Sequence, residues 1–381
     1  MKFLYVAPRF HPNQYPIMEG LIKKGHQVHF CVTYVGLTEK HDDVTVHVLK
    51  PNVWTKVIRF FLGFKGDNYV ENRMAFYFSP KGKEVKRLLK DYEPDVVVLR
   101  DRNFCSLSVY RACKQLKIKK VLLYNQSPIF KALPTGYKKL IKDFWFSLFP
   151  KIRISVCRYE KYPFEKKGLI KDENARFCPH VPRINALQHR SYLEDGKVRI
   201  FDCGKYRPYK NHTLLIDAVK ILVDKGYQNF YVTILGQADN QEEKQYYARL
   251  QEQVRRLGVE DFVHLLTSVP YDEIPAYYLR HDIFALASSV EQATVSILDS
   301  MSYGLATIST SYNGTADYIR QGETGYVFKT GDAQDLSEKI EIYLQNPELV
   351  EKHGKEAIRE VQEDFSFESY YRKFMSVIEE I

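Results

Sequence analysis

The stretch VRIFDCGKYRPYKNHTLLIDAVKILVDKGYQNFYVTILG, residues 198–236, contains the pattern on which the fold prediction rests. An apolar run rich in β-branched residues comes first, a polar loop follows, and apolar residues then recur with the helical period from about His212 to Lys225. A second apolar run, FYVTILG, closes the stretch. Strand, helix and strand in this order predict a βαβ unit, in which a crossover helix joins two parallel strands.

The same alternation continues on both sides of this stretch. The second half carries the strand-like runs FVHLL, DIFALA and LATIST, and the first half carries FLYVA, HQVHFCV, DVVVLR and KVLLY. Because the pattern runs twice, we expect an α/β fold of two doubly wound, Rossmann-like domains that face each other across a cleft. The expected parts are residues 1–187, residues 197–360, and a last helix over residues 361–381 that packs back across the cleft.

The composition excludes several classes of protein. With 381 residues, 45% of them apolar and 27% charged, the chain can form a globular core, unlike a disordered chain or a small disulfide-bonded domain. The first residues, MKFLYVAPRF, are too short an apolar run for a signal peptide, and no apolar run reaches the roughly 18 residues of a membrane span. The six cysteines form no CxxC pair, so we expect a cytoplasmic protein without structural zinc.

The charge is unevenly divided along the chain. Residues 1–190 hold 36 Lys and Arg against 16 Asp and Glu, whereas residues 191–381 hold 20 against 31. The first half therefore carries +20 and the second −11. This asymmetry indicates an anionic partner for the first half, and a membrane surface, a phosphorylated substrate or nucleic acid would each fit.

Ligands of open α/β sheets bind beyond the carboxyl ends of the strands, so the loops after the second-half strands are the first candidates for a site. In the first of these loops, Gly204 ends a strand, and Lys205, Arg207 and Lys210 precede a helix. Cations next to a helix N-terminus suit a diphosphate. A solvated basic turn is the alternative.

The second loop is SSVEQATVSILDSMSYG, residues 288–304. We expect Glu291 in the loop and Asp299 two turns into the following helix, so the two carboxylates cannot share one role. Between them, the amides of Thr294, Val295 and Ser296 would point at a phosphate. Carboxylates on either side of an anion site suit the hydroxyls of a sugar and of a ribose, although Asp299 could also be an exposed helix residue.

A third loop, TSYNGTADYIRQGETGYVFKTGD, is punctuated by glycines. Asn313, Gly314 and Thr315 could present backbone amides to a ligand. A plain turn followed by a helix cap explains these residues nearly as well.

These motifs together resemble the retaining family 4 glycosyltransferases (glycosyl transferases group 1), which have the GT-B fold. Gly204, Lys205 and Lys210 are similar to the family's phosphate-binding loop, with Lys205 where arginine is commoner. EQATVSILD is similar to its paired-acid motif, with Asp299 in place of the second glutamate. NGTADYIRQGETGYVFKTGD and CPHVP resemble two further segments, so the likeness covers most of residues 150–345.

The resemblance implies a retaining, metal-independent hexosyltransferase without a cofactor, whose substrate is a nucleotide sugar, with a UDP sugar as our expectation. It places Lys205 and Lys210 on the diphosphate, Glu291 at the sugar hydroxyls and Asp299 at the ribose; Glu291, Lys210 and Lys205 are the expected catalytic residues. The nucleotide base would lie near Thr267 to Val269. The expected donor contacts are completed by Gly204, Arg207, Gly236, Thr294, Val295 and Ser296.

Two departures from the family pattern concern the first half. The family's first loop usually carries paired glycines, but here it is PRFHPNQYP, so Arg9, His11 or Asn13 would have to contact donor or acceptor. A solvated loop histidine is the alternative for His11. Many members also place a histidine where this chain has NQSP, so Asn125 or Gln126 would supply a neutral hydrogen bond.

Two basic segments of the first half have amphipathic helical patterns. NVWTKVIRFFLGFK, residues 52–65, contains Trp54, Lys56 and Arg59. GYKKLIKDFWFSLF, residues 136–149, contains the other tryptophan and three lysines: Lys138, Lys139, Lys142 and Trp145. Basic helices with aromatic anchors bind anionic bilayers, so we expect a peripheral protein on the inner face of the membrane; packing of both faces on the domain core is the alternative.

The combined hypothesis is a glycosyltransferase that moves a sugar from a nucleotide diphosphate to a hydroxyl of a lipid-linked or surface-polysaccharide acceptor. A soluble transferase with a small acceptor is one alternative, and it would leave the two aromatic helices buried. A catalytically silent protein that binds nucleotide sugars or polyanions is another, prompted by the missing glycines and histidine. Nucleic acid is not an expected partner, because no helix-turn-helix, zinc or ribonucleoprotein signature is present.

Overall fold

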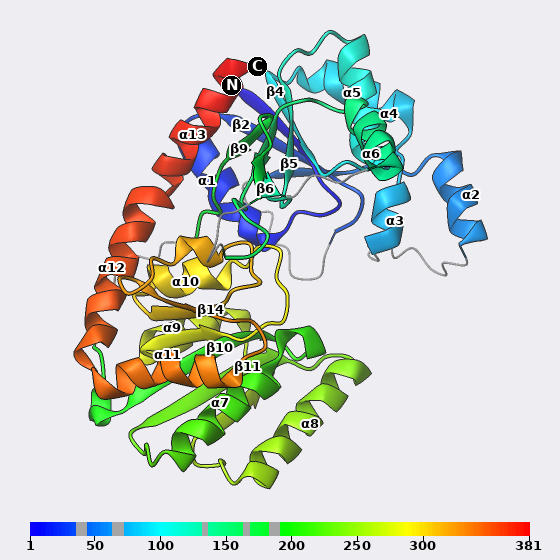
Figure 1. The fold of residues 1–381 in the computed structure, drawn as a ribbon. Coiled ribbons are helices and arrows are strands. Elements are labelled where there is room, and N and C mark those ends of the chain that lie inside the picture. Colours follow the sequence, from blue (N-terminus) through cyan, green and yellow to red (C-terminus); the bar gives the residue numbers. More distant parts are fainter. Residues whose placement is uncertain (36–43, 63–71, 132–135, 163–167, 183–190) are drawn as a thin grey trace. The chain divides into compact units, whose positions relative to one another are not determined.

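The computed structural model describes residues 1–35, 44–62, 72–131, 136–162, 168–182 and 191–381, which form two compact units (Figure 1). Unit 1 comprises Met1–Val156, Gly168–Val181 and Phe367–Ile381, and unit 2 comprises Cys157–Lys167 and Pro182–Ser366. This division differs from the expected one at two places. Cys157–Lys167 counts with unit 2 rather than with the first half, and the final segment that belongs to unit 1 begins at Phe367 rather than at residue 361.

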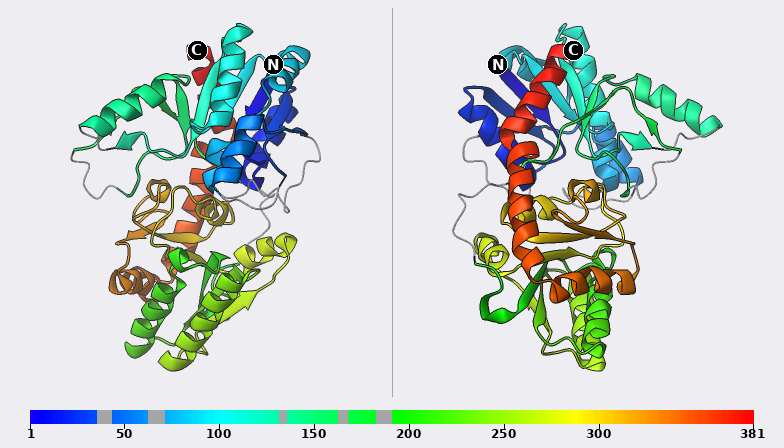
Figure 2. Two further views of the ribbon diagram at one scale, coloured as in Figure 1. Left: turned by 90° about the vertical axis from the view of Figure 1, so that its right-hand side faces the viewer. Right: turned by 60° about the vertical axis from the view of Figure 1, so that its left-hand side comes forward.

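Unit 1 is built on a seven-stranded parallel sheet with the strand order β3-β2-β1-β4-β5-β7-β9. Its central strands are nearly continuous apolar runs, as expected for a parallel sheet that is covered on both faces. Figure 2 shows α1 and α13 on one face and α4 and α5 on the other. The strands are β1 (Lys2–Val6), β2 (Gln27–Val32), β3 (Thr45–Val48), β4 (Val96–Arg100), β5 (Val121–Asn125), β7 (Arg153–Ser155) and β9 (Ala175–Phe177), and β6 (Phe130–Lys131) pairs separately with β8 (Ile170–Lys171).

The helices of unit 1 begin and end where the local sequence dictates. In α4, Val85, Leu89 and Tyr92 recur at helical spacing and are buried, and Glu93 ends the helix in the left-handed conformation. In α5, Asn103 caps the N-terminus by accepting a hydrogen bond from the Ser106 amide at 2.8 Å. The helices are η1 (Pro12–Gln14), α1 (Tyr15–Lys23), α2 (Val53–Phe61), α3 (Asn72–Tyr77), α4 (Gly82–Tyr92), α5 (Phe104–Gln115), α6 (Tyr137–Ser147) and α13 (Phe367–Glu380).

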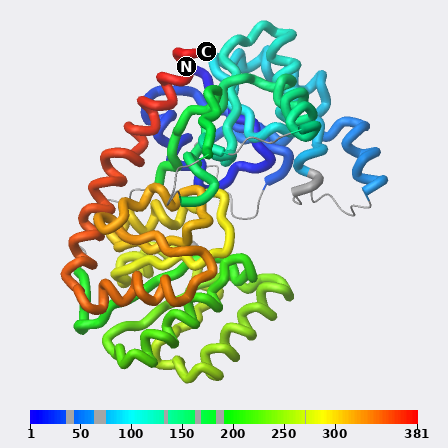
Figure 3. The backbone as a smooth tube through the Cα atoms, in the orientation of Figure 1, coloured from blue at the N-terminus to red at the C-terminus, as the bar shows by residue number. Residues whose placement is uncertain are grey.

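The last helix, α13, completes unit 1, so that both chain termini lie in this unit (Figure 3). Phe374 is fully buried, and its ring lies 5.8 Å from that of Phe3 on β1. Gly20 of α1 allows the close approach of α13, because a Cβ at this position would lie 2.2 Å from the Phe367 ring. The C-terminal helix is therefore a structural part of the unit formed by the N-terminal strands.

Unit 2 contains a six-stranded parallel sheet with the order β12-β11-β10-β13-β14-β15. The opening βαβ prediction is confirmed by β10 (Val198–Lys205), α7 (His212–Asp224) and β11 (Phe230–Gln237). The other elements are η2 (Glu194–Gly196), η3 (Pro208–Lys210), α8 (Gln241–Leu257), β12 (Val263–Thr267), η4 (Tyr271–Glu273), α9 (Ile274–Arg280), β13 (Ile283–Leu286), α10 (Ser296–Ser302), β14 (Ala306–Thr310), η5 (Ala316–Tyr318), β15 (Gly325–Phe328), α11 (Ala333–Gln345) and α12 (Glu348–Asp364).

Candidate functional site

The carboxyl ends of three neighbouring strands in unit 2 bring predicted residues side by side. The register pairs Gly204 of β10 with Gly236 of β11, and Gly236 with Thr267 of β12. The following residue, Ser268, has a φ of 61°, which is unusual for a residue with a side chain. This edge of the sheet is where ligands bind in doubly wound domains.

Lys210 and Glu291 form the centre of the site. Lys210 ends η3, Glu291 follows β13, and the Lys210 Nζ lies 2.5 Å from the Glu291 Oε1. Both side chains are largely buried, with exposed fractions of 13% and 14%. Burial alone would lower the pKa of Lys210, but the charge and hydrogen bond of Glu291 outweigh burial and raise this pKa. Lys210 therefore keeps its positive charge at the strand ends, where Glu291 balances it.

Gly204 allows Lys210 to fold back over the end of β10. A Cβ at this position would lie 3.3 Å from the Lys210 Cε, which is a tight contact. The glycine of the predicted phosphate-binding loop thus leaves room for the lysine, because a larger residue would force the Lys210 side chain to move by a few tenths of an ångström.

Asp202 and His212 are two buried residues near Lys210, and neither was predicted from the sequence as a site residue. Asp202 is buried on β10, and burial raises its pKa to about 7. The His212 Nε2 lies 3.6 Å from the Asp202 Oδ2, and burial together with the charge of Lys210 lowers the histidine pKa to about 3. The signal was an aspartate inside the apolar run VRIFDCG, where an ionisable residue is unusual.

The other two cations of the predicted loop have different surroundings. Lys205 is exposed at the end of β10, and no acidic side chain in the described residues forms an ion pair with it. The Arg207 Nε, in contrast, donates to the Glu243 Oε1 at 3.0 Å. Glu243 is buried in the first turn of α8, so Arg207 anchors this helix. Lys205 thus fits a diphosphate contact, whereas the Nε of Arg207 is already bound.

The loop after β13 is held in place by the segment after β14. The Glu291 amide donates to the Tyr312 carbonyl at 3.0 Å, and the Gly314 amide donates to the Glu291 carbonyl at 3.2 Å. A Cβ at Gly314 would lie 2.0 Å from the Gln292 carbonyl oxygen. Gly314 is therefore required for this backbone contact. Its amide is bonded within the loop, so the plain turn, which was the second of our two interpretations, describes Gly314.

The amides of the second predicted loop are only partly available. The Thr294 amide donates to the Thr315 hydroxyl at 3.3 Å, and the Thr315 amide donates to the Asn313 Oδ1 at 3.1 Å. Val295 and Ser296 lie at the start of α10, which no side chain caps. The expectation of a phosphate contact thus stays with Val295 and Ser296.

Asp299 lies in the first turn of α10 rather than two turns into a helix, because residues 291–295 form a loop. It is half-buried, and its charge contributes to raising the pKa of Cys203 on β10, whose main cause is burial. Asp299 therefore lies near the end of β10, which is compatible with the predicted ribose contact.

Gly236 also has a structural role, and its predicted donor contact stays a prediction. A Cβ at this position would lie 2.6 Å from the ring of Tyr206. Tyr206 is fully buried, and its hydroxyl lies 2.7 Å from the Leu266 carbonyl oxygen and 2.9 Å from that of Ile234. Gly236 thus makes room for a tyrosine that ties the strand ends together. Thr267 and Val269 remain half-exposed at this edge.

In unit 1, His11 and Asn13 begin the short helix η1 after β1. The His11 Nδ1 accepts a hydrogen bond from the Asn13 amide at 3.3 Å. Burial, with the charges of Arg9 and Arg100, lowers the pKa of His11 to about 4, so the ring is neutral at pH 7. His11 is therefore a partly buried capping residue rather than a solvated loop histidine.

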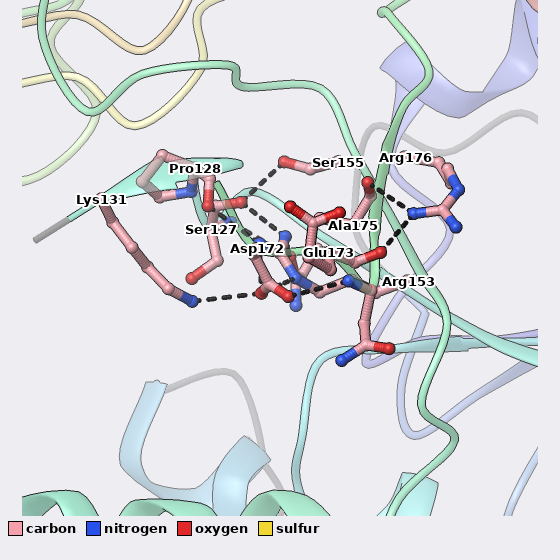
Figure 4. Close-up of polar contacts among 11 residues, drawn as sticks. Ser127, Pro128, Lys131, Arg153, Ser155, Asp172, Glu173, Ala175 and Arg176 are labelled. Atoms are coloured by element: carbon pink, nitrogen blue, oxygen red, sulfur yellow. Dashed lines mark hydrogen bonds and ion pairs between the residues drawn. The ribbon is translucent and has the colours of Figure 1, made fainter. Parts of the chain in front are cut away.

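The buried Arg153 is the centre of a hydrogen-bond network with Ser127, Pro128 and Asp172 (Figure 4). Asn125, at the end of β5, also belongs to this network. The Asn125 Oδ1 accepts from the Arg153 Nη1 and from the Ser127 amide, both at 3.1 Å. Arg153 also donates to the Ser127 and Pro128 carbonyls at 2.7 and 2.8 Å. The oxygen of Asn125 thus holds its own loop, and the expected sugar contact stays with the half-exposed Gln126.

The two predicted membrane helices are largely exposed in unit 1. On α2 only Thr55 is buried; Trp54 is 57% exposed and Phe60 81%. Lys56 is exposed and Arg59 half-exposed on the same helix. No residue of α6 is buried, and its exposed apolar residues are Tyr137, Leu140, Ile141 and Phe144. Solvent-facing apolar surface of this kind is typical of interaction sites.

Trp145 is the exception among the predicted anchors. Its ring packs against those of Phe104 and Phe149, at centroid distances of 5.4 and 5.1 Å. Trp145 thus attaches α6 to unit 1 and is not an exposed anchor, while Lys138 and Lys139 are exposed and Lys142 is half-exposed. No helix in the described part of the chain is long and apolar enough to cross a membrane.

Comparison with solved structures defines the fold class as GT-B. A glycosyltransferase from Rickettsia africae ESF-5 matches with a TM-score of 0.73 at 18% identity, covering 100% of this chain and 98% of that one. Anabaena Alr3699/HepE in complex with UDP matches with a TM-score of 0.72 at 14% identity, covering 100% of both chains. These similarities extend over both units of the present chain.

Sequence comparison adds a family match for unit 2. Residues 185–360 match the model of the family Glycosyl transferases group 1, and this range contains Lys210 and Glu291. Mannosylfructose-phosphate synthase of Agrobacterium fabrum is 22% identical over 55% of this chain and 46% of its own length. The lipopolysaccharide core biosynthesis mannosyltransferase LpcC of Rhizobium leguminosarum is 29% identical over 32% of this chain and 34% of its own length. The matched segments thus span less than half of these relatives.

Proposed function

We propose that the protein is a retaining glycosyltransferase that uses a nucleotide-diphosphate sugar, with a UDP sugar as the expected donor. The observation that carries this proposal is the Lys210–Glu291 pair at the carboxyl edge of the unit 2 sheet, inside the segment that matches the group 1 family. Structures of the similar Anabaena Alr3699/HepE in complex with UDP and with UDP-glucose support a uridine nucleotide.

The residues of unit 2 fit the charge changes of this reaction. As the bond between the sugar C1 and the diphosphate oxygen breaks, negative charge develops on the leaving group, and Lys210 and Lys205 can stabilise this charge. The acceptor hydroxyl oxygen forms the new bond to C1 on the same face, and its proton passes to the departing diphosphate. Glu291 accepts hydrogen bonds from the sugar hydroxyls and fixes the sugar in the reactive orientation.

The acceptor in this proposal is a lipid-linked or surface-polysaccharide hydroxyl at the inner face of the membrane. The exposed apolar residues of α2 and α6, together with Lys56, Lys138 and Lys139, suit the surface of an anionic bilayer. A soluble transferase with a small acceptor would have no evident use for this exposed surface.

The donor is tested by melting-temperature shifts with nucleotides and nucleotide sugars, since a ligand that binds only the native state stabilises it. We expect a shift with UDP and with one UDP sugar, followed by transfer of labelled sugar to a membrane extract. Binding without any transfer, with extract present, would instead indicate the catalytically silent alternative. The absence of any shift over the whole panel would contradict the proposed donor class.

A further inference from the structure

The carboxyl edge of the unit 1 sheet gathers basic side chains from separate strands. Arg9 and His11 follow β1, Arg100 is the last residue of β4, and His180 follows β9. The parallel register aligns Val6 of β1 with Leu99 of β4, so the loops after these strands leave the sheet side by side. Arg9 and Arg100 thus place two of the positive charges of the first half at the carboxyl edge of this sheet.

Several polar atoms at this edge are buried without a hydrogen-bond partner. His180 is 1% exposed, and its Nε2 has no partner among the described residues. The Asn13 Oδ1 and the Arg102 Nε are in the same condition. Since a buried polar group without a partner costs about 1–3 kcal/mol, their grouping at one edge indicates a site for a polar ligand.

The edge has more positive than negative charge. Among the described residues, no acidic side chain forms an ion pair with Arg9, and the one carboxylate that pairs with Arg100 is that of the exposed Asp101, at 3.6 Å. The Arg100 guanidinium also lies 5.4 Å from the centre of the Tyr124 ring. The other nearby carboxylate, Asp172, is neutralised by Arg153 at 3.0 Å and Lys131 at 3.2 Å, as Figure 4 shows. Burial alone would raise the pKa of Asp172, but the charges of Arg153 and Lys131 outweigh it and lower that pKa.

The histidines at this edge are neutral hydrogen-bonding groups at pH 7. Burial, together with the nearby charges of Arg100 and His11, lowers the pKa of His180 to about 3. The two arginines therefore supply the positive charge, and the neutral imidazoles can form directional hydrogen bonds with a ligand. A planar guanidinium binds phosphate and carboxylate oxygens in pairs, which defines the ligand class.

We propose that this edge of unit 1 binds an anionic group of the acceptor, a phosphate or a carboxylate, through Arg9 and Arg100, with His11 and His180 as neutral partners. The inference rests on the proposed function, in which Lys205 and Lys210 of unit 2 already neutralise the diphosphate of the donor. The cations of unit 1 therefore serve the second substrate. The accepting hydroxyl accordingly belongs to a molecule that carries a phosphate or a carboxylate.

Hydrogen-exchange mass spectrometry on the full-length protein tests this site, because it locates binding along the chain. Inorganic phosphate and glucuronate are the probes for the two anionic groups. We expect either probe to slow exchange in peptides covering residues 7–14 and 100–106. In Arg9→Gln and Arg100→Gln, binding weakens about tenfold or more, since each variant loses a charge-assisted contact. Arg111→Gln, on the exposed side of α5, is the matched control and keeps the wild-type response.

A second arm separates the acceptor from the donor as the source of the anion. Saturating UDP should slow exchange in residues 204–212 and leave the probe response of unit 1 intact. If UDP abolishes the probe response of unit 1, the edge belongs to the donor site and the proposal is overturned. Probe protection that persists in both arginine variants would also overturn it. No response of unit 1 to either probe would also overturn it, while UDP binding to unit 2 would still support the proposed function. Arg9→Lys, which keeps the charge, should retain part of the response if the glutamine variants fold poorly.

Discussion

At the scale of single residues, the candidate site depends on a contact between side chains that are 81 positions apart in the sequence, Lys210 and Glu291. Each residue restricts the other, since Glu291 keeps the lysine charged and Lys210 compensates a largely buried carboxylate. A replacement that keeps the shape of either side chain should therefore reduce the activity with little effect on the fold. A replacement that changes the shape should disturb both.

Replacement of Glu291 by glutamine keeps the shape and removes the charge. We expect the transfer rate to fall by about 100-fold or more, because positioning and electrostatic contributions of this kind are typically of that size. The melting temperature should change little, and UDP should still bind. Steady-state transfer of labelled sugar and thermal unfolding measure both effects. Glu242→Gln, an exposed carboxylate on α8, is the control; a near-normal rate for Glu291→Gln would refute its assigned role.

Asp202 gives the site a pH dependence of stability. Its folded pKa of about 7 lies above the ordinary value, so the folded state holds a proton that the unfolded state releases between about pH 4 and pH 7. Stability from this residue therefore falls as the pH rises through that window. The Asp202→Asn variant lacks this titration. The free energy of unfolding of the variant minus that of the wild type should therefore rise between pH 5 and pH 7, by about 1.4 kcal/mol per pH unit and by a few kcal/mol at most. Urea unfolding at several pH values measures this difference, and a difference independent of pH would contradict the assignment.

At the scale of elements, the strands and the main loops could be predicted from the sequence because parallel strands have a strong local signature. The βαβ unit over residues 198–236 is the clearest case. The partner of each loop residue could not be predicted, since it depends on tertiary contacts. Arg207 binds Glu243 on α8, and Gly236 makes room for Tyr206, although both had the spacing expected of ligand contacts.

The amphipathic pattern of α6 was likewise informative only in part. Periodicity shows that a helix has an apolar face, but it does not show what covers that face. In the structure, Trp145 packs on Phe104 and Phe149, while Leu140 and Phe144 face solvent. The exposed apolar surface of α6 thus includes Leu140 and Phe144 but not Trp145, which we had predicted as an anchor.

Charge reversal on α6 tests whether this helix binds membranes. We expect Lys138→Glu, Lys139→Glu and Lys142→Glu together to weaken binding to anionic liposomes by at least about two orders of magnitude, because the loss of three basic residues alone costs about 1 kcal/mol each. The same triple reversal at Lys83, Lys86 and Lys90 of α4 is the matched control, since α4 has its apolar face buried. Liposome flotation at low and high salt measures binding. Equal loss in both triple variants would mean that net charge, rather than α6, governs the interaction.

At the scale of the whole molecule, the chain begins and ends in the same unit. The packing of α13 against α1 is specific enough to be tested at one position. Gly20→Ala places a methyl group against the Phe367 ring and should lower the free energy of unfolding by about 1–3 kcal/mol. Gly82→Ala at the start of α4 meets no atom within 4 Å and is the control. Chemical denaturation measures the stability of both variants. In a Phe367→Ala background, Gly20→Ala should lower the free energy of unfolding by less. Equal stability of the two glycine variants would contradict this packing.

The return of α13 to unit 1 also determines the order in which the protein can fold during synthesis. The strands β1 and β2 leave the ribosome before unit 2, whereas Phe374, which packs against Phe3, leaves after it. At about 5–20 residues per second, translation of the intervening Pro182–Ser366 takes roughly 10–40 s. For that time the face of the nascent unit 1 sheet that α13 covers is exposed, so we expect this unit to reach its final stability only after α13 has been synthesised.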